Sequence, residues 1–457
     1  MEIEYFFHII VLLANPMSII LIIFGVLIGI FFGAMPGLNG PIAVALLLPI
    51  TYNFSPENGL LMLGGIYMGA SYGGSISAIL LNCPGTGQAA CTALDGYPMA
   101  QQGKGKEALY YSIFSSSIGG LLGVIIMIFF TPLLANIALK FGPPEMFLVC
   151  MTGLAVVGSI MGETLSKGFF AVGFGLVLSM VGIDTMSMSS SCRITFGLYN
   201  LQAGFHLIPV SVGLFAISEM LILSSSHARN LVDVAMHNIS AVRVLKNLFA
   251  NWKILLKSSV IGASIGILPG TGAAIASFIS YGEAKRSSKG SESFGKGNIE
   301  GIIAPESANN AAVGGAFVPL LALGIPGSAT TAIIFGALTV HGLLPGPKLF
   351  VEHAEITYTF MVGMLFTILI MAFVGIYGVP LFSKVLSIKI KYIIPSVLAF
   401  SIVGAYTARN NLFDVGLAIL FGIIGVFFKH ARIPIAPVIL GLILSTITEE
   451  NLRRSII

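Results

Sequence analysis

The chain has 457 residues, of which 56% are hydrophobic and only 9% are charged, and its mean hydropathy is +0.96. A soluble domain carries roughly a quarter charged residues, so this composition excludes a soluble protein and predicts an all-α polytopic membrane protein. The formal net charge of +4 lies in loops and does not indicate a nucleic-acid partner. The four cysteines and seven histidines lack the spacing of a metal or disulfide site, so no metal is predicted.

A membrane-spanning helix needs about 20 apolar residues, and about twelve hydrophobic segments approach this length. Their limits are 5–33, 58–82, 107–137, 144–162, 166–184, 205–224, 258–282, 305–325, 356–382, 392–408, 411–429 and 432–448. Three shorter apolar runs, 38–50, 86–94 and 328–340, are too short to cross alone. We interpret them as half-helices or re-entrant arms, so the sequence predicts a bundle with broken helices.

Basic residues are absent before Lys104 and then concentrate in three loops. These loops are 225–257, 283–298 and 383–391. Because loops rich in Lys and Arg face the cytoplasm, all three are predicted to be cytoplasmic. The segment 258–282 then has both ends on one side, and its Pro-Gly break at 269–270 becomes the tip of a re-entrant hairpin. The alternative is a kinked span whose basic loop is tolerated outside.

The region 225–257 is predicted to link two transmembrane halves, 1–224 and 258–457. Within it, Ser240–Lys257 places apolar residues on one helical face and basic residues on another. Together with Trp252, the only tryptophan, this pattern is typical of an amphipathic helix on the cytoplasmic membrane surface.

The two halves repeat each other in sequence. Gly33–Ala43 aligns with Gly266–Ala276 at a numbering offset of 266 − 33 = 233. Leu81–Thr86 aligns with Leu323–Ser328 at a numbering offset of 323 − 81 = 242. The first break has acidic or neutral flanks in one half and basic flanks in the other, which predicts an inverted repeat with its broken tips near the membrane midplane. Two alternatives stay open: twelve spans would give parallel halves, and Pro-Gly is common in Gly-rich membrane sequence.

The four Pro-Gly breaks are the predicted substrate site. Half-helix N-termini present unpaired N–H groups and the positive end of the helix dipole, both of which attract carboxylates. The predicted substrate-binding residues are Pro36, Gly37, Asn39, Asn82, Pro84, Gly85, Thr86, Pro269, Gly270, Thr271, Gly272, Pro326, Gly327, Ser328, Thr330 and Thr331. The structural alternative is that the Ser and Thr residues only cap the half-helices.

A carboxylate and two amides form a second candidate site. Glu306, Asn309 and Asn310 share one helix face, and Pro305 fits the first position of that helix. These three polar residues are candidates for a coupling-ion site, or they cap the helix and lock it to a neighbour. Glu219 lies in an apolar run, where a carboxylate suggests a function in proton coupling or subunit contact. A position at the segment end near the surface is the simpler interpretation.

Other residues and motifs do not indicate a site. Asp95 and Asp184 lie at segment ends and are expected to face water. Gly69–Gly73 fits the Gly-x-Ser-x-Gly pattern of hydrolases, but no strand context or His partner is evident. Gly290–Lys296 resembles a phosphate-binding loop but lacks the Ser or Thr that must follow Lys296. The sequence therefore predicts neither an enzyme nor an ATP-driven pump, and any active transport is secondary.

Several longer motifs are specific enough to compare with known families. They are Asn82–Thr86, Ala93–Pro98, Pro269–Gly272, Tyr281–Lys285, Phe294–Gly301, Ala304–Asn310, Leu323–Gly327 and Leu344–Pro347. Together they resemble the large membrane subunit, of the TctA type, of the tripartite tricarboxylate transporters. The resemblance covers most of the chain.

This resemblance implies a multi-pass permease of the bacterial inner membrane. Such a subunit works with a small four-helix membrane subunit and a periplasmic solute-binding protein. It is driven by an ion gradient, with Na⁺ or H⁺ as coupling ion and no other cofactor, and typical substrates are citrate and other small di- or tricarboxylates. The alternatives are a carboxylate-permeable channel without coupling and an intramembrane enzyme, for which no paired nucleophile and base are found. A homo-oligomer is a further possibility.

Overall fold

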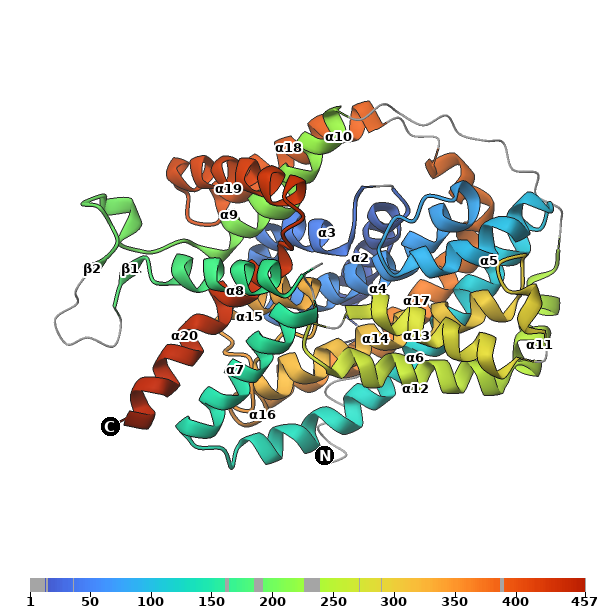
Figure 1. The fold of residues 1–457 in the computed structure, drawn as a ribbon, viewed down its shortest axis with the longest axis horizontal. Coiled ribbons are helices and arrows are strands. Elements are labelled where there is room, and N and C mark those ends of the chain that lie inside the picture. The colour runs from blue at the N-terminus through green and yellow to red at the C-terminus, as the bar shows by residue number, and fades with distance from the viewer. Residues whose placement is uncertain are drawn as a thin grey trace.

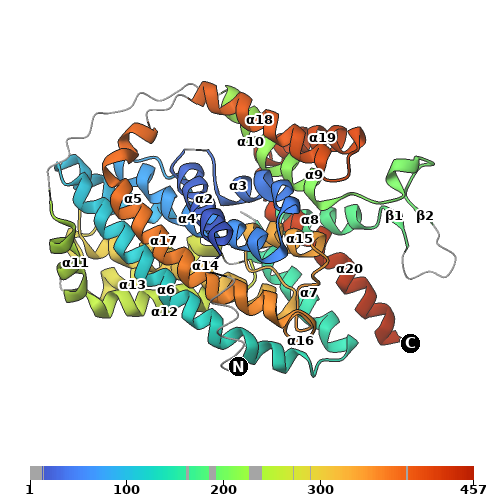
Figure 2. The same cartoon turned by 180° about the vertical axis from the view of Figure 1, so that it is seen from behind.

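The computed structural model describes residues 13, 15–35, 37–160, 164–184, 192–225, 239–270, 272–288, 290–386 and 390–456. Over these ranges the chain is almost entirely α-helical, and its helices pack around a shared apolar core (Figures 1 and 2). This confirms the predicted all-α fold.

The helices follow the predicted apolar segments. Those of the first half are α2 (Pro16–Ala34), α3 (Gly40–Leu47), α4 (Pro56–Leu81), α5 (Ala89–Gln101), α6 (Gly105–Ala138), α7 (Pro143–Ile160), α8 (Leu165–Ser179), α9 (Leu207–Ser211) and α10 (Ser218–Ser225), the last two joined by a π-helical segment, Val212–Ile217. Those that follow are α11 (Ala241–Ala250), α12 (Trp252–Ile267), α13 (Gly272–Ser287), α14 (Glu300–Leu323), α15 (Ala329–Val340), α16 (Leu349–Glu352), α17 (Ala354–Leu386), α18 (Ile390–Thr407), α19 (Leu412–His430) and α20 (Ala436–Ile456). The three short apolar runs form the short helices α3, α5 and α15.

Within the described ranges, five helices are long and apolar enough to cross a membrane by length and composition. They are Pro16–Ala34, Gly105–Ala138, Leu207–Ser224, Ala354–Phe382 and Leu412–His430. Several other apolar helices are shorter than a full span, and the helices of the centre carry breaks. Such breaks are tolerated at membrane depth because protein surrounds them.

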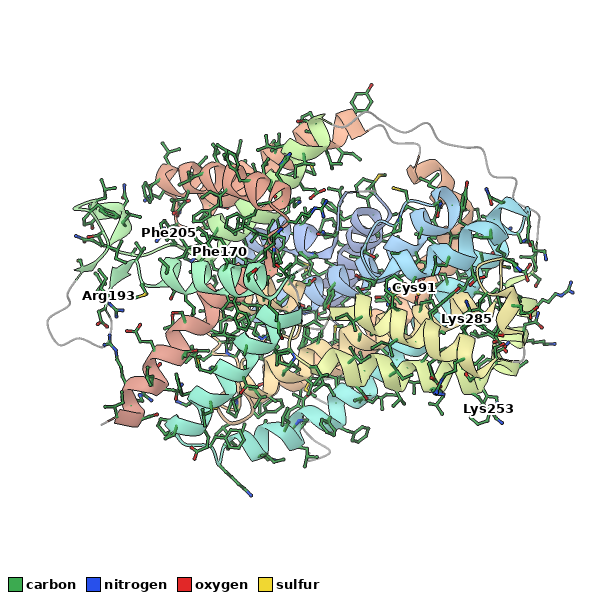
Figure 3. The ribbon with its side chains drawn as sticks, viewed as in Figure 1. Cys91, Phe170, Arg193, Phe205, Lys253 and Lys285 are labelled. Atoms are coloured by element: carbon green, nitrogen blue, oxygen red, sulfur yellow. The ribbon has the colours of Figure 1, made fainter. Side chains whose placement is uncertain are left out.

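The helices α12 and α13 form a hairpin around the break at 268–271. Their far ends lie at the same end of the molecule, where Figure 3 labels Lys253 and Lys285. There Lys257 of α12 donates to Glu283 of α13, and this ion pair holds the two far ends together. The segment predicted as 258–282 is therefore two antiparallel half-length helices and not one kinked helix.

Two helices, α4 and α14, occupy the centre of the molecule. Every residue of Gly59–Leu80 in α4 and of Gly301–Ala322 in α14 is buried. The two buried stretches have one numbering offset at both ends, since 301 − 59 = 242 and 322 − 80 = 242. A helix with apolar or small residues on every face is buried inside a bundle. Because the two buried stretches match at one offset, the two halves have equivalent central helices.

Glycines bring α2 against α4 and α12 against α14 in the same way. A Cβ atom on Gly33 would lie 2.3 Å from the carbonyl oxygen of Ala70, and one on Gly266 would lie 2.4 Å from that of Ala312. Only a residue without a side chain permits this approach of two backbones. The two glycines are related by the first offset of the sequence repeat and the two alanines by the second, so the contact recurs in both halves.

The breaks also recur in backbone geometry. Gly37 has φ +85°, and Gly270, its counterpart at the first repeat offset, has φ +77°. Asn82 has φ +50°, and Gly324, its counterpart at the second offset, has φ +71°. Glycine and asparagine are the residues that adopt this left-handed region most readily, and here they end α4 and α14. The internal repeat found in the sequence is thus present in the structure.

Gly85 offers a test of this packing. A Cβ on Gly85 would lie 1.8 Å from the carbonyl oxygen of Gly33, and backbone cannot move aside as a side chain can. We expect Gly85→Ala to lower the free energy of unfolding by about 3 kcal/mol, measured as a lower thermal midpoint in detergent. The matched control is Gly87→Ala in the same break, where a Cβ meets no atom within 4 Å. Equal midpoints for the two variants would contradict the close approach.

The linker differs from its prediction. The amphipathic helix predicted over Ser240–Lys257 is interrupted at Asn251, where α11 ends and the first arm of the hairpin begins. Val244 and Leu248 of α11 are buried, and α11 packs against α6. These two residues of the apolar face are therefore covered by protein, whereas Phe249 and Trp252 of the predicted face stay exposed.

The expectation that Asp95 faces water is wrong. Asp95, on α5, is fully buried. Its Oδ1 accepts hydrogen bonds from the backbone N–H groups of Gly295 (2.8 Å), Gly297 (3.0 Å) and Asn298 (2.8 Å). Its Oδ2 accepts a hydrogen bond from the Tyr281 hydroxyl at 2.9 Å. Three of the longer sequence motifs, Ala93–Pro98, Tyr281–Lys285 and Phe294–Gly301, thus meet at one carboxylate. Asp95 fixes the 290–298 loop to the first half.

The start of α14 was also predicted wrongly. The helix begins at Glu300, so Pro305 lies inside it and does not occupy its first position. The earlier start is explained by the preceding loop, whose N–H groups are already ordered by Asp95. Pro305 follows the first turn of α14, so it removes one intrahelical hydrogen bond there.

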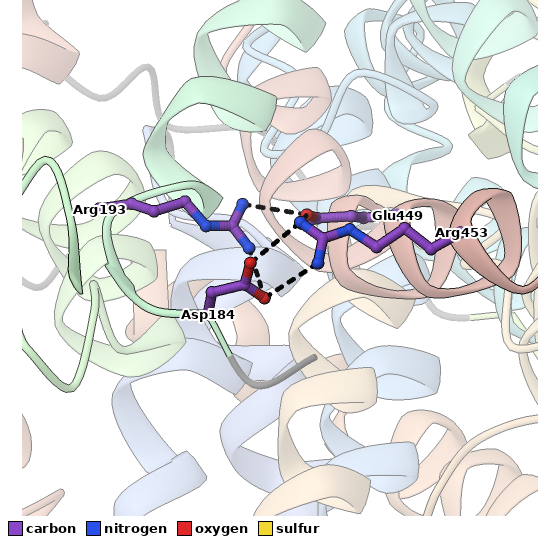
Figure 4. A network of polar contacts seen from close by, with 4 residues as sticks. All are labelled: Asp184, Arg193, Glu449 and Arg453. Carbon is purple, nitrogen blue, oxygen red and sulfur yellow. Dashed lines mark hydrogen bonds and ion pairs between the residues drawn. The ribbon is translucent and has the colours of Figure 1, made fainter. Parts of the chain in front are cut away.

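Asp184 likewise does not face water, because it is 8% exposed and lies in a network of two carboxylates and two arginines (Figure 4). Arg193 contacts Asp184 at 2.7 Å and Glu449 at 3.0 Å, and Arg453 contacts Asp184 at 3.0 Å and Glu449 at 2.5 Å. The hydrogen bond that Arg453 donates to Asp184 raises the pKa of the arginine. The network ties a short hairpin, β1 (Gly182–Ile183) paired antiparallel with β2 (Cys192–Arg193), to the end of α20.

Candidate functional site

A cavity of about 490 Å³ lies where the first breaks of the two halves meet. Four parts of the chain line it: the start of α3, the π-helical segment with α10, the start of α13, and the end of α19 with the residues that lead into α20. The lining residues are Asn39, Ile42, Phe215, Glu219, Gly270, Gly272, Ala274, Ile275, Lys429, Ile433, Pro434, Ile435 and Ala436. Its volume is within the range of about 300–1,000 Å³ that is usual for small-molecule sites.

Two half-helices begin at this cavity. Asn39 is the N-cap of α3, and its Oδ1 accepts the N–H of Ile42 at 3.2 Å. On the other side Gly270 and Gly272 form the turn into α13. Each helix start carries a partial positive charge of roughly half a unit from its unpaired N–H groups. The cavity is therefore electropositive on two sides, which favours an anion.

An ion pair lies in the same cavity. Lys429, in the last turn of α19, donates to Glu219, in the first turn of α10. Glu219 lies inside the continuous helix Leu207–Ser224, at the point where its π-helical segment ends, and it lines the cavity between the breaks. No sequence pattern pointed to Lys429, since a lysine at the end of an apolar segment is the usual way for a helix to leave the membrane.

In the second half of the chain, the second Pro-Gly break lies next to the first. The N–H of Gly270 donates to the carbonyl of Gly327 at 3.1 Å, which joins the two breaks of the second half. Ser328 caps α15 through a reciprocal bond with Thr331, and its hydroxyl is 3.0 Å from the hydroxyl of Tyr67 on α4. The capping role proposed as an alternative for Ser328 and Thr331 is therefore present. Thr330 lies beside the start of α3, where a Cβ on Gly40 would meet its Oγ1 at 3.4 Å.

The break after α4 differs from the others in exposure. Asn82 is exposed, whereas Thr86 is buried and its hydroxyl has no hydrogen-bond partner among the described residues. That hydroxyl packs against Gly74 of α4, where a Cβ would lie 2.1 Å from it. Gly85 of this break packs against the backbone of Gly33 at the end of α2, and none of the described residues of the break lines the cavity.

Of the predicted substrate-binding residues, the cavity brings together Asn39, Gly270 and Gly272. Pro36 and Thr271 lie outside the described residues. The other described members of the set are not among the residues that line the cavity. Sequence motifs located the breaks correctly, but they did not show which side chains of α10 and α19 would complete the site.

The second candidate, Glu306, is the acceptor at the centre of a hydroxyl cage. Its Oε1 accepts hydroxyls of Ser75 (2.5 Å) and Thr92, and its Oε2 accepts those of Ser112 (3.0 Å) and Ser116 (2.7 Å). All five side chains are fully buried. The donors come from α4, α5 and α6, so one carboxylate of the second half joins three helices of the first. Four hydroxyl donors satisfy an ionised carboxylate without a cation.

Asn309 and Asn310 also face α4 and not the cavity. Asn309 donates to the carbonyl of Ser71 at 2.9 Å, and Asn310 lies 3.5 Å from that of Met68. The Oδ1 atoms of both amides are buried and have no hydrogen-bond partner in the described part of the chain. Among the described residues no cluster of three or more His, Cys, Asp or Glu side chains is placed to hold a metal ion.

Comparison with known proteins identifies the family. The model of the Tripartite tricarboxylate transporter TctA family matches residues 19–440. The chain belongs to this family. An uncharacterised 52.8 kDa protein of the TAR-I ttuC' 3' region of Agrobacterium vitis is 36% identical over 450 residues, covering 97% of this chain and 88% of the relative. An uncharacterised protein of the TAR-II ttuC' 3' region of the same organism is 38% identical over 196 residues, covering 43% of this chain and 81% of the relative. No solved structure matches the chain.

Membership in the TctA family confirms several sequence-based predictions. The chain is a membrane transport protein and not an enzyme, and it is the large subunit of a tripartite system, which implies partner subunits.

Proposed function

We propose that this TctA-family subunit is a secondary transporter that moves a small di- or tricarboxylate through the cavity between the broken helices, driven by an ion gradient. The observation that carries the proposal is the convergence of two half-helix N-termini and Lys429 on one cavity. Helix N-termini and a lysine are the groups that bind carboxylates in a partly buried site.

The partners and membrane arrangement follow from the same proposal. The subunit works in the bacterial inner membrane with a small four-helix membrane subunit and a periplasmic solute-binding protein that delivers the substrate. The basic end of the α12–α13 hairpin faces the cytoplasm, so that the hairpin is re-entrant, and the first arm enters from the opposite side as its inverted counterpart. The chain itself forms homo-oligomers or acts as a monomer within that assembly.

The coupling ion is Na⁺ or H⁺. Glu306, Asn309 and Asn310 remain proposed coupling-ion residues because their carboxylate and amide oxygens are buried at the interface of the two halves. Movement of the halves would change the hydroxyl cage of Glu306, and a cation would then find oxygen ligands there.

The test is uptake by proteoliposomes that contain the subunit and its partner proteins. With an imposed Na⁺ or H⁺ gradient we expect labelled citrate or succinate to accumulate above its external concentration, and to equilibrate without one. Flux that never exceeds equilibrium would support the alternative, a carboxylate-permeable channel. Absence of any flux for both compounds and for other di- and tricarboxylates would overturn the proposed function.

A further inference from the structure

The ion pair in the cavity joins helices from the two halves. Lys429 and Glu219 are 210 residues apart in the chain. Their side chains are 30% and 18% exposed, so both are partly buried and both remain accessible from the cavity. In such surroundings each charge depends on the other, because an unpaired charge is costly.

The backbone fixes where the two charges meet. A Cβ on Gly213 would lie 2.4 Å from the carbonyl oxygen of Ala418, and one on Gly425 would lie 2.7 Å from the Cβ of Ser218. The π-helical segment that precedes Glu219 and the helix that carries Lys429 are thus in backbone contact. π-helical turns are frequent at functional sites, where they redirect a side chain.

We propose that a substrate carboxylate replaces the Glu219 carboxylate on Lys429, and that Glu219 then binds the coupling proton. This inference rests on the proposed function and goes beyond it by naming the substrate ligand and the proton carrier. In the exchange the Glu219–Lys429 ion pair breaks, a carboxylate–Lys429 ion pair forms, and a proton from the aqueous side bonds to a Glu219 oxygen. On release the proton returns to water on the other side and the original ion pair forms again.

Charge balance explains why the proton accompanies the substrate. In the empty cavity the charges of Glu219 and Lys429 cancel. A bound di- or tricarboxylate alone would add at least two negative charges to a cavity with largely apolar walls, and it would leave Glu219 without its cation beside another anion. Protonation of Glu219 removes the repulsion between Glu219 and the substrate and lowers the net negative charge by one, and the two helix N-termini face the carboxylate that Lys429 does not bind. Substrate and proton therefore bind together more favourably than either binds alone.

The side-chain donors among the described lining residues favour a proton over a sodium ion. Of these residues, Glu219 and Asn39 carry side-chain oxygens, and the Asn39 Oδ1 is already occupied by the Ile42 N–H. Apart from Lys429, the other described lining residues have apolar side chains or none, as in Phe215 and Gly272. A sodium ion requires several oxygen ligands, whereas a proton requires only the carboxylate.

Few titratable groups surround Glu219. Of the described residues that line the cavity, Lys429 is the one other titratable group that faces it, since α3 and α13 contribute none. α18 packs against α10 but contributes no residue to the lining. His430 follows Lys429 and has its Nδ1 2.9 Å from the carbonyl oxygen of Val426 in its own helix. Within the cavity the pH dependence of transport is therefore assigned to Glu219, and this inference places the coupling proton there and not at Glu306.

The first test uses Glu219→Gln, which imitates the protonated state. In proteoliposomes with the partner subunits, we expect this variant to exchange labelled succinate across the membrane but to lose accumulation driven by a pH gradient. Glu219→Asp keeps a carboxylate and should keep accumulation. The matched control is Glu283→Gln, which breaks a Glu–Lys pair far from the cavity and should accumulate succinate as the wild type does.

The second test concerns Lys429. We expect Lys429→Gln to raise the half-saturating succinate concentration for exchange by about tenfold or more, the usual loss when a charged hydrogen-bond partner is removed. Lys429→Arg should keep most of the affinity. Because a lone Glu219 charge disfavours folding, Glu219→Gln with Lys429→Gln is prepared as a charge-neutral double variant, and size-exclusion profiles identify folded protein. The double variant should show the same loss of affinity.

The outcomes separate this inference from the proposed function. If the wild type moves no di- or tricarboxylate, the proposed function fails and the inference fails with it. If the wild type accumulates substrate but Glu219→Gln accumulates it equally on a pH gradient, the inference alone is overturned. Accumulation that responds to Na⁺ and not to pH, or unchanged affinity in folded Lys429→Gln and in the double variant, overturns it as well.

Discussion

Glu306→Ala is expected to prevent folding or to lower the free energy of unfolding by about 4 kcal/mol or more. The substitution removes the common acceptor of four buried hydroxyl groups, and each unsatisfied buried donor costs about 1–3 kcal/mol. Some hydroxyls can turn to a backbone carbonyl, so the loss is smaller than the full sum. The measurement is the thermal midpoint of the detergent-solubilised protein, followed by size-exclusion chromatography.

Two further variants distinguish a structural role of Glu306 from a role in binding the coupling ion. Glu292→Ala removes an exposed glutamate and should leave the midpoint unchanged. Glu306→Gln keeps one acceptor oxygen and should be intermediate in stability. A Glu306→Gln protein that is as stable as the wild type, but whose uptake no longer depends on the ion gradient, would favour the coupling-ion role. A wild-type midpoint for Glu306→Ala would contradict the hydroxyl cage.

Asp95→Ala should release the loop that leads into α14. The carboxylate accepts three backbone N–H groups and one phenol hydroxyl, and hydrogen bonds to a charged group contribute about 1.5–3 kcal/mol each. We expect a loss of about 4 kcal/mol or more, and rapid hydrogen exchange of the amides of Gly295, Gly297 and Asn298. Mass-spectrometric exchange on the 290–298 loop measures this directly.

Tyr281→Phe provides the control for the loop. It removes one of the four bonds to Asp95 and leaves the three backbone bonds, so it should cost about 1 kcal/mol and leave the loop amides protected. Equal exchange in Asp95→Ala and Tyr281→Phe would show that the loop is held by other contacts.

The sequence was informative wherever structure depends on local chemistry. Apolar segments located the helices, and Pro-Gly pairs located the breaks, because Pro and Gly act on the backbone of their own neighbourhood. The repeat offsets were visible for the same reason, and the structure reproduces them in the contacts of Gly33 and Gly266. Asn39, Gly270 and Gly272 could be placed at the site because each belongs to a break.

Residues whose role depends on distant partners could not be assigned. Lys429 looked like the end of a helix, and only the fold brings it to Glu219. Asp95 was predicted to face water at the end of a segment, because the loop N–H groups that donate hydrogen bonds to it lie in the other half of the chain. The hydroxyls around Glu306 are single Ser and Thr residues on three helices, which no local pattern distinguishes from packing residues.

The two arms that meet at the cavity differ in helix type and in charge. α3 continues into a 3₁₀ segment, Leu48–Asn53, whereas α13 is α-helical over all of its 16 residues. α13 carries Glu283 and Arg286 at its far end, whereas Gly40–Asn53 has no charged residue. In the proposed transport cycle the two arms would therefore not exchange conformations as equivalent partners. The inward-facing and outward-facing states of that cycle would then differ in energy without substrate.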